Sequence, residues 1–172
     1  MMQGLSKEEL LDKIEEAAQS YESNYHGCSR CVLLALQEHL NLGDELTFQA
    51  STPFASGIAM KGETCGALLG GLLAVGLATA SKNIEDESAL SGSLAAGFRF
   101  YRRFEKEMGA TLCRDIQKAK LGRYFNIADL NEYKEFKEAG GYVECPKVVG
   151  KASRLAAEFI LELRERGQET KG

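Results

Sequence analysis

Four cysteines that stand far apart in the chain are the residues best suited to chemistry: Cys28, Cys65, Cys113 and Cys145. Three of them, Cys28, Cys65 and Cys145, stand where a helix is predicted to begin. The amide groups at a helix N-terminus favour negative charge, so a cysteine there is expected to ionise more easily. The thiolate is the form that binds metals and attacks disulfides. The pattern therefore indicates thiolate chemistry, and it does not name a substrate.

Four thiolates gathered in one place would repel one another. A converged set is therefore stable only as disulfides, as protonated thiols or as ligands of a cation. If all four cysteines meet, a metal or an iron–sulfur cluster is favoured, and if they meet in pairs, dithiol redox chemistry is favoured. A zinc ribbon is disfavoured because its ligands come as two close pairs. Which cysteines would pair cannot be deduced from the sequence.

Two residues near the first cysteine are weaker candidates. Cys31 forms a Cys28-x-x-Cys31 pair, and side chains three apart on a helix lie about 5 to 6 Å from each other, close enough to pair or to share a metal. Cysteine is also among the most buried residue types, and the apolar neighbours of Cys31 favour a core position. His26 is a candidate base, metal ligand or proton donor, although a histidine in a linker is more often simply solvated.

Residues 65–70, Cys-Gly-Ala-Leu-Leu-Gly, resemble the C-G-A-x-x-G box of the prokaryotic family C_GCAxxG_C_C, described as redox-active proteins with four separated cysteines. Cys28, followed by an apolar helix, is similar to the first cysteine of the family. Cys113 is similar to the third, and Cys145 to the fourth. The resemblance extends over roughly residues 21–163. Cys31 departs from it, because the family commonly has a small residue there.

The resemblance implies an α-helical protein with a redox or metal role and no established reaction. The first hypothesis is thiol–disulfide chemistry or electron transfer with a redox partner protein, with all four cysteines as catalytic residues. The second is an iron–sulfur cluster or another soft metal held by the same four cysteines, with Cys31 and His26 as weaker ligands. The third is a structural or adaptor protein whose buried cysteines are inert. Whether the protein is an enzyme is left open.

Length and composition exclude several other classes. The 172 residues, 44% of them hydrophobic, suffice for one domain with its own core. The net charge of -4 gives no reason to expect a nucleic-acid partner. The N-terminal residues lack the pattern of a signal peptide, and five cysteines make a poor disulfide framework, so a reducing, cytoplasmic location is expected. The longest apolar run, residues 65–80, is shorter than the roughly 20 residues of a membrane span.

The spacing of apolar residues predicts an all-α protein, a single-domain bundle of about five to seven helices. The domain is expected to span residues 1–172, with a core from about 6 to 166 and a frayed tail at 167–172. Residues 110–128, which include Cys113, are expected to be irregular, and the last helix is expected to open at Cys145-Pro146. Pro53 is expected to break or bend the third helix. The other helices are predicted at 6–23, 28–40, 44–55, 64–80, 85–108 and 129–139.

The helix predicted at 64–80 carries small residues four apart, such as Gly66, Gly70 and Ala74. Small residues at this spacing let another helix approach closely. Each glycine weakens a helix by about 0.5 to 1 kcal/mol relative to alanine, so close packing or a bound group is expected to offset that cost. The same face suits an internal contact or a homodimer, and a homodimer is weakly favoured.

Overall fold

Several helices in this protein begin at residues whose side chains cap them. The computed structural model describes residues 4–169. Ser6 and Glu9 form the predicted capping box: the Ser6 N–H donates to Glu9 Oε2 at 2.7 Å, and the Glu9 N–H donates to Ser6 Oγ at 3.2 Å. The side chains of Asp86 and Asp129 cap two later helices. The helices are α1 (Lys7–Tyr25), α2 (Cys28–Leu40), α3 (Glu45–Ser51), α4 (Gly66–Thr79), α5 (Glu87–Met108), α6 (Cys113–Leu121), α7 (Leu130–Glu138) and α8 (Gly141–Glu169).

Helices account for the whole regular structure of residues 4–169, apart from one isolated β-bridge between Thr64 and Leu112. This confirms the prediction of an all-α single domain. The described residues form eight α-helices and one short 3-10 helix, η1 (Thr52–Phe54). The helix beyond the predicted number is α6, which lies in the stretch that was expected to be irregular. Pro53 lies in η1, so the predicted break in the third helix is confirmed.

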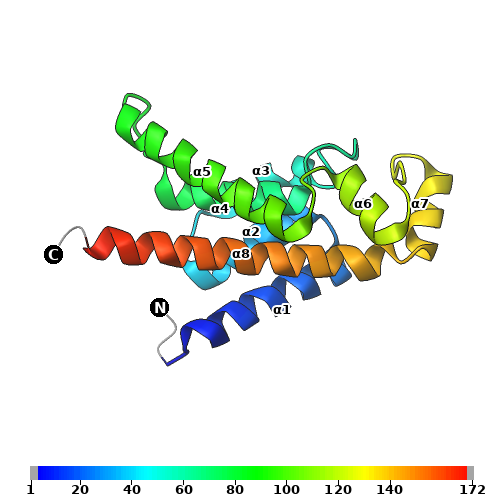
Figure 1. The fold of residues 1–172 in the computed structure, drawn as a ribbon, viewed down its shortest axis with the longest axis horizontal. Helices are drawn as coiled ribbons and strands as arrows, with labels where there is room; N and C mark the ends of the chain where they lie inside the picture. Colours follow the sequence, from blue (N-terminus) through cyan, green and yellow to red (C-terminus); the bar gives the residue numbers. More distant parts are fainter. Residues whose placement is uncertain (1–3, 170–172) are drawn as a thin grey trace.

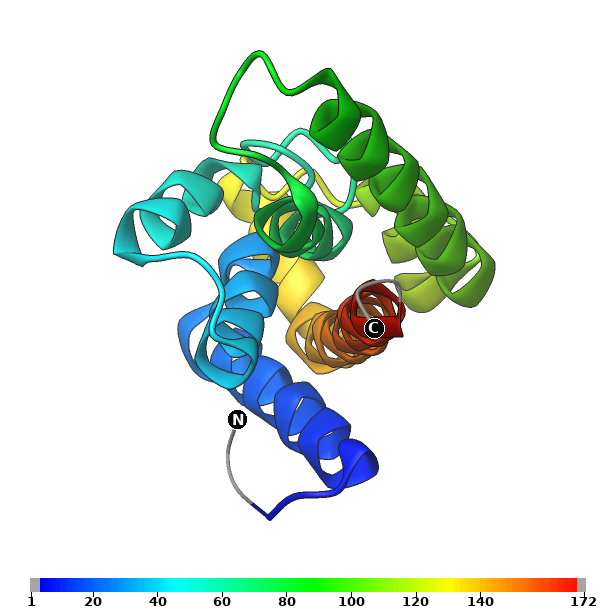
Figure 2. The same cartoon turned by 90° about the vertical axis from the view of Figure 1, so that its left-hand side faces the viewer.

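The longest helix, α8, runs through the middle of the bundle. Figure 2 shows it nearly end-on, with α1, α2, α4 and α5 around it, and these helices all contact it. The helices α6 and α7 lie at one end of the molecule, and the last turn of α8 lies at the other (Figure 1). One hydrophobic core joins the five long helices, and its largest fully buried side chains include Phe100, Phe104, Ile14, Leu33, Leu36, Leu68 and Ile160.

The glycines of α4 allow it to approach its neighbours closely. A Cβ atom added at Gly70 would lie 2.4 Å from the carbonyl oxygen of Ser29 on α2, and one added at Gly71 would lie 2.5 Å from the ring of Phe100 on α5. These contacts are the close packing that the sequence predicted. The homodimer stays a prediction, because the small residues on this face are already in contact within the chain. Among residues 4–169, no helix combines the length and the apolar character needed to cross a membrane.

The predicted start of the last helix is wrong. Gly140, with a φ of 86°, turns the chain after α7, and the N–H groups of Val143 and Glu144 both donate to its carbonyl oxygen. The helix α8 therefore begins at Gly141, and Pro146 lies inside it. At this sixth position of the helix, Pro146 has no N–H to donate to the Tyr142 carbonyl, so α8 lacks one backbone hydrogen bond there. At the other end α8 continues to Glu169, so the predicted frayed tail begins as helix, and residues 170–172 lie outside the described residues.

Candidate functional site: a cavity lined by four cysteines

The first two cysteines meet where α2 and α4 begin. Cys28 is the first residue of α2, and Cys65 is the N-cap of α4. Gly66, the residue after Cys65, lies against the Cys28 side chain: an added Cβ at Gly66 would stand 2.4 Å from Cys28 Sγ. The absence of a side chain at Gly66 therefore makes room for the Cys28 thiol. The glycines of the Cys-Gly-Ala-Leu-Leu-Gly segment thus serve the site as well as the packing of the helices.

Backbone pairing brings Cys113 beside Cys65. The isolated bridge joins the residues that immediately precede the two cysteines, Thr64 and Leu112. The Cys65 N–H donates to the Thr111 carbonyl at 2.8 Å, and the Cys113 N–H donates to the Glu63 carbonyl at 2.7 Å. Cys113 is also the first residue of α6. The prediction that it lies in an irregular segment is therefore wrong, and the pairing is what fixes the start of α6.

Gln117, one turn further along α6, contacts the Cys113 thiol. Its Nε2 lies 3.5 Å from Cys113 Sγ, and its Oε1 accepts from the Phe125 N–H at 3.0 Å. The second hydrogen bond fixes the amide so that its N–H faces the sulfur. Gln117 is only 5% exposed, so both of its polar ends are used inside the protein.

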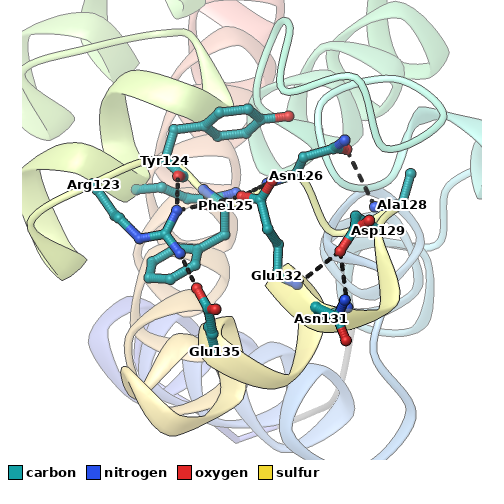
Figure 3. Close-up of polar contacts among 10 residues, drawn as sticks. Arg123, Tyr124, Phe125, Asn126, Ala128, Asp129, Asn131, Glu132 and Glu135 are labelled. Carbon is teal, nitrogen blue, oxygen red and sulfur yellow. Dashed lines mark hydrogen bonds and ion pairs between the residues drawn. The ribbon is translucent and has the colours of Figure 1, made fainter.

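The loop after α6 is braced by charged side chains of α7 (Figure 3). Arg123 donates to the Tyr124 carbonyl at 3.1 Å and forms ion pairs with Glu132 and Glu135. The Asn126 N–H donates to Glu132 at 2.9 Å. These contacts hold the backbone on either side of Phe125, whose N–H orients the amide beside Cys113. Sequence reasoning assigned no role to this loop.

Cys145 reaches the site from α8, and it does so from inside the helix. It is the fifth residue of α8, so it is not at a helix N-terminus as predicted. Its side chain lines the same cavity as Cys28, Cys65 and Cys113. The cavity measures about 70 Å³, and its wall also includes Glu22, His26, Ser56, Ala67, Gln117 and Tyr142. The four cysteines that the sequence singled out therefore come together from four separate helix segments.

A strained turn covers the Cys28 side of the cavity. Ser56, Ile58, Ala59 and Met60 all have φ angles between 47° and 64°, in the left-handed region that side chains disfavour. The Ser56 N–H points at Cys28 Sγ at a distance of 3.4 Å. Strained backbone of this kind is typical of functional sites, where the surrounding structure maintains it. Here the strained turn supplies a polar contact to the Cys28 thiol.

Burial raises the pKa of all four cavity thiols. The pKa of Cys28 rises to about 12, first because desolvation disfavours the thiolate, and then because Glu22 and Cys113 lie near it. The pKa values of Cys65 and Cys145 lie well above the ordinary value, and that of Cys113 is also raised, each with desolvation as the main cause. At neutral pH the four thiols are therefore protonated, one of the three stable forms that charge repulsion allows.

The prediction that the helix N-termini make these cysteines easier to ionise is therefore wrong. Backbone N–H groups do favour the thiolate, for example those of Ala67 and Leu68 at Cys65. A helix terminus contributes about 0.3 to 1 kcal/mol, however, whereas full burial shifts a pKa by up to several units. Desolvation is the larger effect, and the depth at which each thiol is buried depends on the tertiary fold rather than on the residues next to it.

The two weaker candidates lie at the edge of the site. Cys31 is only 2% exposed, and its Sγ lies 3.4 Å from the His26 carbonyl oxygen. It belongs to the core cluster, as its apolar neighbours suggested. His26 lines the cavity, and its ring stacks on Tyr142 with centroids 3.9 Å apart. Its Nδ1 lies 2.7 Å from the Glu22 carbonyl oxygen, so it is held in the wall rather than solvated.

Glu22 is the residue of the cavity wall that sequence reasoning missed. It is 4% exposed, and its pKa is raised to about 7, mainly by desolvation, although Cys31, Arg30 and the Gly27 N–H favour the carboxylate. One signal for it was available. The buried face of α1 consists of Leu11, Ile14, Ala18 and Glu22, so the carboxyl group continues an apolar stripe at helical spacing.

The metal hypothesis depends on how closely the ligands gather. Within residues 4–169, no group of three or more His, Cys, Asp and Glu side chains is arranged as a metal site. All five cysteines are free thiols. The four cysteines are the soft ligands that an iron–sulfur cluster or another thiophilic metal would take, and this ligand set stays a prediction.

A model of one protein family matches most of the chain. The family is described as "Putative redox-active protein (C_GCAxxG_C_C)", and the match covers residues 7–159. The chain belongs to this family. No curated protein and no solved structure matches it. In this member of the C_GCAxxG_C_C family, all four cysteines of the motif line one cavity, and Gly66 of the box leaves the space that the Cys28 thiol occupies.

Proposed function

We propose that this protein is a dithiol–disulfide redox protein in which Cys28 forms a reversible disulfide with a second cysteine of the cavity. One observation carries the proposal: four cysteines from four separate helices line a single cavity of about 70 Å³. Inert core cysteines would have no reason to share one cavity.

Cys28 is the central thiol of the set. It interacts electrostatically with each of the other three, Cys65, Cys113 and Cys145. After burial, the charge of a Cys28 thiolate is the main cause that raises the pKa of both Cys65 and Cys145. We therefore place Cys28 in the disulfide, and its partner is the cysteine that the experiment below identifies.

The reaction is a two-step exchange with a disulfide of a redox partner. The Cys28 thiol loses its proton, and the thiolate attacks one sulfur of the partner disulfide, which forms a mixed disulfide and releases one partner thiolate. The second cavity cysteine then loses its proton and attacks Cys28 Sγ, which closes the internal disulfide and releases the second partner thiolate. The two protons from the cavity convert the two partner thiolates into thiols, so the protein is oxidised and the partner is reduced by two electrons.

The test compares cysteine-to-serine variants across a series of redox buffers. Reduced and oxidised dithiothreitol set the potential, remaining thiols are alkylated, and mass spectrometry counts and locates them. We expect wild-type protein to lose two thiols in one transition, and Cys28→Ser to lose this transition completely. Cys31→Ser is the matched control on the same helix, and it should titrate as wild type does. A Cys28→Ser protein that titrates like wild type would exclude the proposal.

A further inference from the structure

The strongest unexplained group in the molecule is the Glu22 carboxyl. It lies in the last turn of α1, is 4% exposed and lines the cysteine cavity. Its Oε2 atom has no hydrogen-bond partner among the described residues. Most buried polar atoms are paired, because an unpaired one costs about 1 to 3 kcal/mol, so this atom requires an explanation.

We propose that Glu22 is the proton acceptor and donor of the thiol site. The inference rests on the proposed function and deepens it: the carboxylate takes the proton from a cavity thiol as that thiol attacks, and the resulting carboxylic acid gives it to the thiolate that leaves. The cycle moves one proton and returns Glu22 to its starting form. The second thiol repeats it when the internal disulfide closes.

A structural role does not account for Glu22 equally well. A buried carboxylate is ordinarily held by an ion pair, yet Arg30, the cation whose charge lowers the pKa of Glu22, places its guanidinium over the Phe48 ring, 5.6 Å from the centroid. The remaining groups that face Glu22 are thiols, ring groups and a backbone amide. The Cys31 thiol and the Gly27 N–H hydrogen-bond to the carboxylate. The charge of Glu22 also acts on Cys28, Tyr142 and Cys145, and the His26 ring contacts the backbone carbonyl of Glu22.

The environment also gives the Glu22 carboxyl a pKa suited to proton transfer at neutral pH. Its pKa of about 7 lies near neutral pH, where both of its protonation states are populated. A group that transfers protons works best when its pKa is close to the operating pH. The thiols need such a group more than exposed cysteines do, because burial leaves them protonated at this pH. The carboxyl and the four thiols line the same cavity of about 70 Å³, which has room for a water molecule that could carry a proton between them.

Replacing Glu22 shows whether it transfers protons or only contributes a nearby negative charge, because the two roles change the rate of thiol exchange in opposite directions. The negative charge of Glu22 raises the pKa of Cys28 and Cys145, so removing a bystander charge would ease thiolate formation and speed the reaction at neutral pH. Removing a proton acceptor would slow it. General acid–base groups typically contribute about 10²-fold or more. Glu22→Gln is therefore expected to slow the exchange by about that factor.

The experiment measures the exchange rate with 4,4′-dithiodipyridine, a small disulfide whose thione product absorbs light, between about pH 6 and pH 9. For wild type we expect the rate to rise through an inflection at about pH 7 and then level off. Glu22→Gln should lose this inflection and follow thiol ionisation alone. Glu22→Asp, which keeps the carboxyl, should keep the inflection at a reduced rate. Glu16→Gln, an exposed residue of the same helix, is the matched control and should behave as wild type.

The outcomes separate the two proposals. If wild type and Glu16→Gln close a disulfide while Glu22→Gln is as fast or faster, the role of Glu22 is wrong and the dithiol function stands. If wild type closes no internal disulfide, the dithiol function itself is wrong. Circular dichroism of each variant establishes that it is folded, and the Glu22→Asp profile decides the matter should Glu22→Gln fail to fold.

Discussion

The two ends of α4 adjoin hollows of opposite character. At its N-terminus lies the cysteine cavity, about 70 Å³ in volume and lined by four thiols and a carboxyl group. Near its C-terminus, α4 and α5 border a groove of about 720 Å³, lined mainly by apolar side chains such as Leu90, Leu94 and Phe98. The smaller hollow holds the four cysteine thiols and the buried Glu22 carboxyl. In this molecule burial of titratable groups, rather than volume, marks the candidate site.

The pH dependence of stability is the largest expected difference between the two ends. The Glu22 carboxyl ionises near pH 4.5 in the unfolded chain and near pH 7 in the folded protein. Below pH 4.5 both states hold the proton, so stability is unaffected, and between pH 4.5 and 7 the unfolded state is increasingly favoured. The loss of unfolding free energy should reach about 3 kcal/mol and then stay constant.

Urea unfolding at a series of pH values measures this loss. Other carboxyl groups also titrate, so the quantity to compare is the difference between wild type and Glu22→Gln. That difference should grow between pH 4.5 and 7, with the variant gaining relative to wild type. Leu94→Gln, a substitution in the groove between α4 and α5, is the control: its unfolding free energy should vary with pH as that of wild type does. A constant difference between wild type and Glu22→Gln would mean that Glu22 is not desolvated, and the contrast between the hollows would then lose its main support.

The glycines of α4 provide the second comparison. An added Cβ at Gly70 would meet backbone and side chain of α2, the Ser29 carbonyl at 2.4 Å and Val32 at 2.9 Å, whereas one at Gly76 would meet nothing within 4 Å. We expect Gly70→Ala to lower the unfolding free energy by about 1 to 3 kcal/mol, because the helices must separate. Gly76→Ala should raise it by about 0.5 to 1 kcal/mol, because alanine favours the helix.

Thermal melting of the two variants tests this asymmetry. The two substitutions add the same methyl group to the same helix, so helix propensity cancels and only the surroundings differ. Equal shifts in Tm would mean that α4 does not pack against α2 as closely at its N-terminal half as the structure indicates. Gly70→Ala should also change the reactivity of the cavity thiols, since Ser29 directly follows Cys28.

The all-α fold could be predicted from the sequence because it depends on local patterns, and the four cysteines could be selected as candidates from the family resemblance. Helical spacing, capping residues and the glycines of residues 65–70 each act within a few residues of themselves. The position of Cys145 inside α8 was missed because Pro146 suits the first position of a helix. Gly140 and Gly141 are equally compatible with a helix that starts earlier, and local rules do not distinguish between these two starting points. The pairing of Thr64 with Leu112 joins distant segments, and no local pattern signals it.

The strained turn could not be predicted, and Glu22 was missed although it continues the apolar stripe of α1, because both run against ordinary preferences. Ser56, Ile58, Ala59 and Met60 adopt left-handed backbone that residues of these types disfavour. A glutamate at a core position, such as Glu22, is ordinarily interpreted as the polar edge of a helix. Ser56 of this turn and Glu22 line the same cavity. Departures from local rules concentrated in one place are themselves typical of a functional site.

The groove between α4 and α5 should show the smallest effects. Leu94 and Phe98 are 66% and 68% exposed, so replacing either with glutamine removes little buried surface. We expect Leu94→Gln and Phe98→Gln to change the unfolding free energy by no more than about 0.5 kcal/mol and to leave the rate of thiol exchange unchanged. Urea unfolding and the dithiodipyridine assay measure the two quantities on the same samples. A slower exchange in either variant would show that the groove and the cysteine cavity are coupled through α4, and the two hollows would then have to be treated as one site.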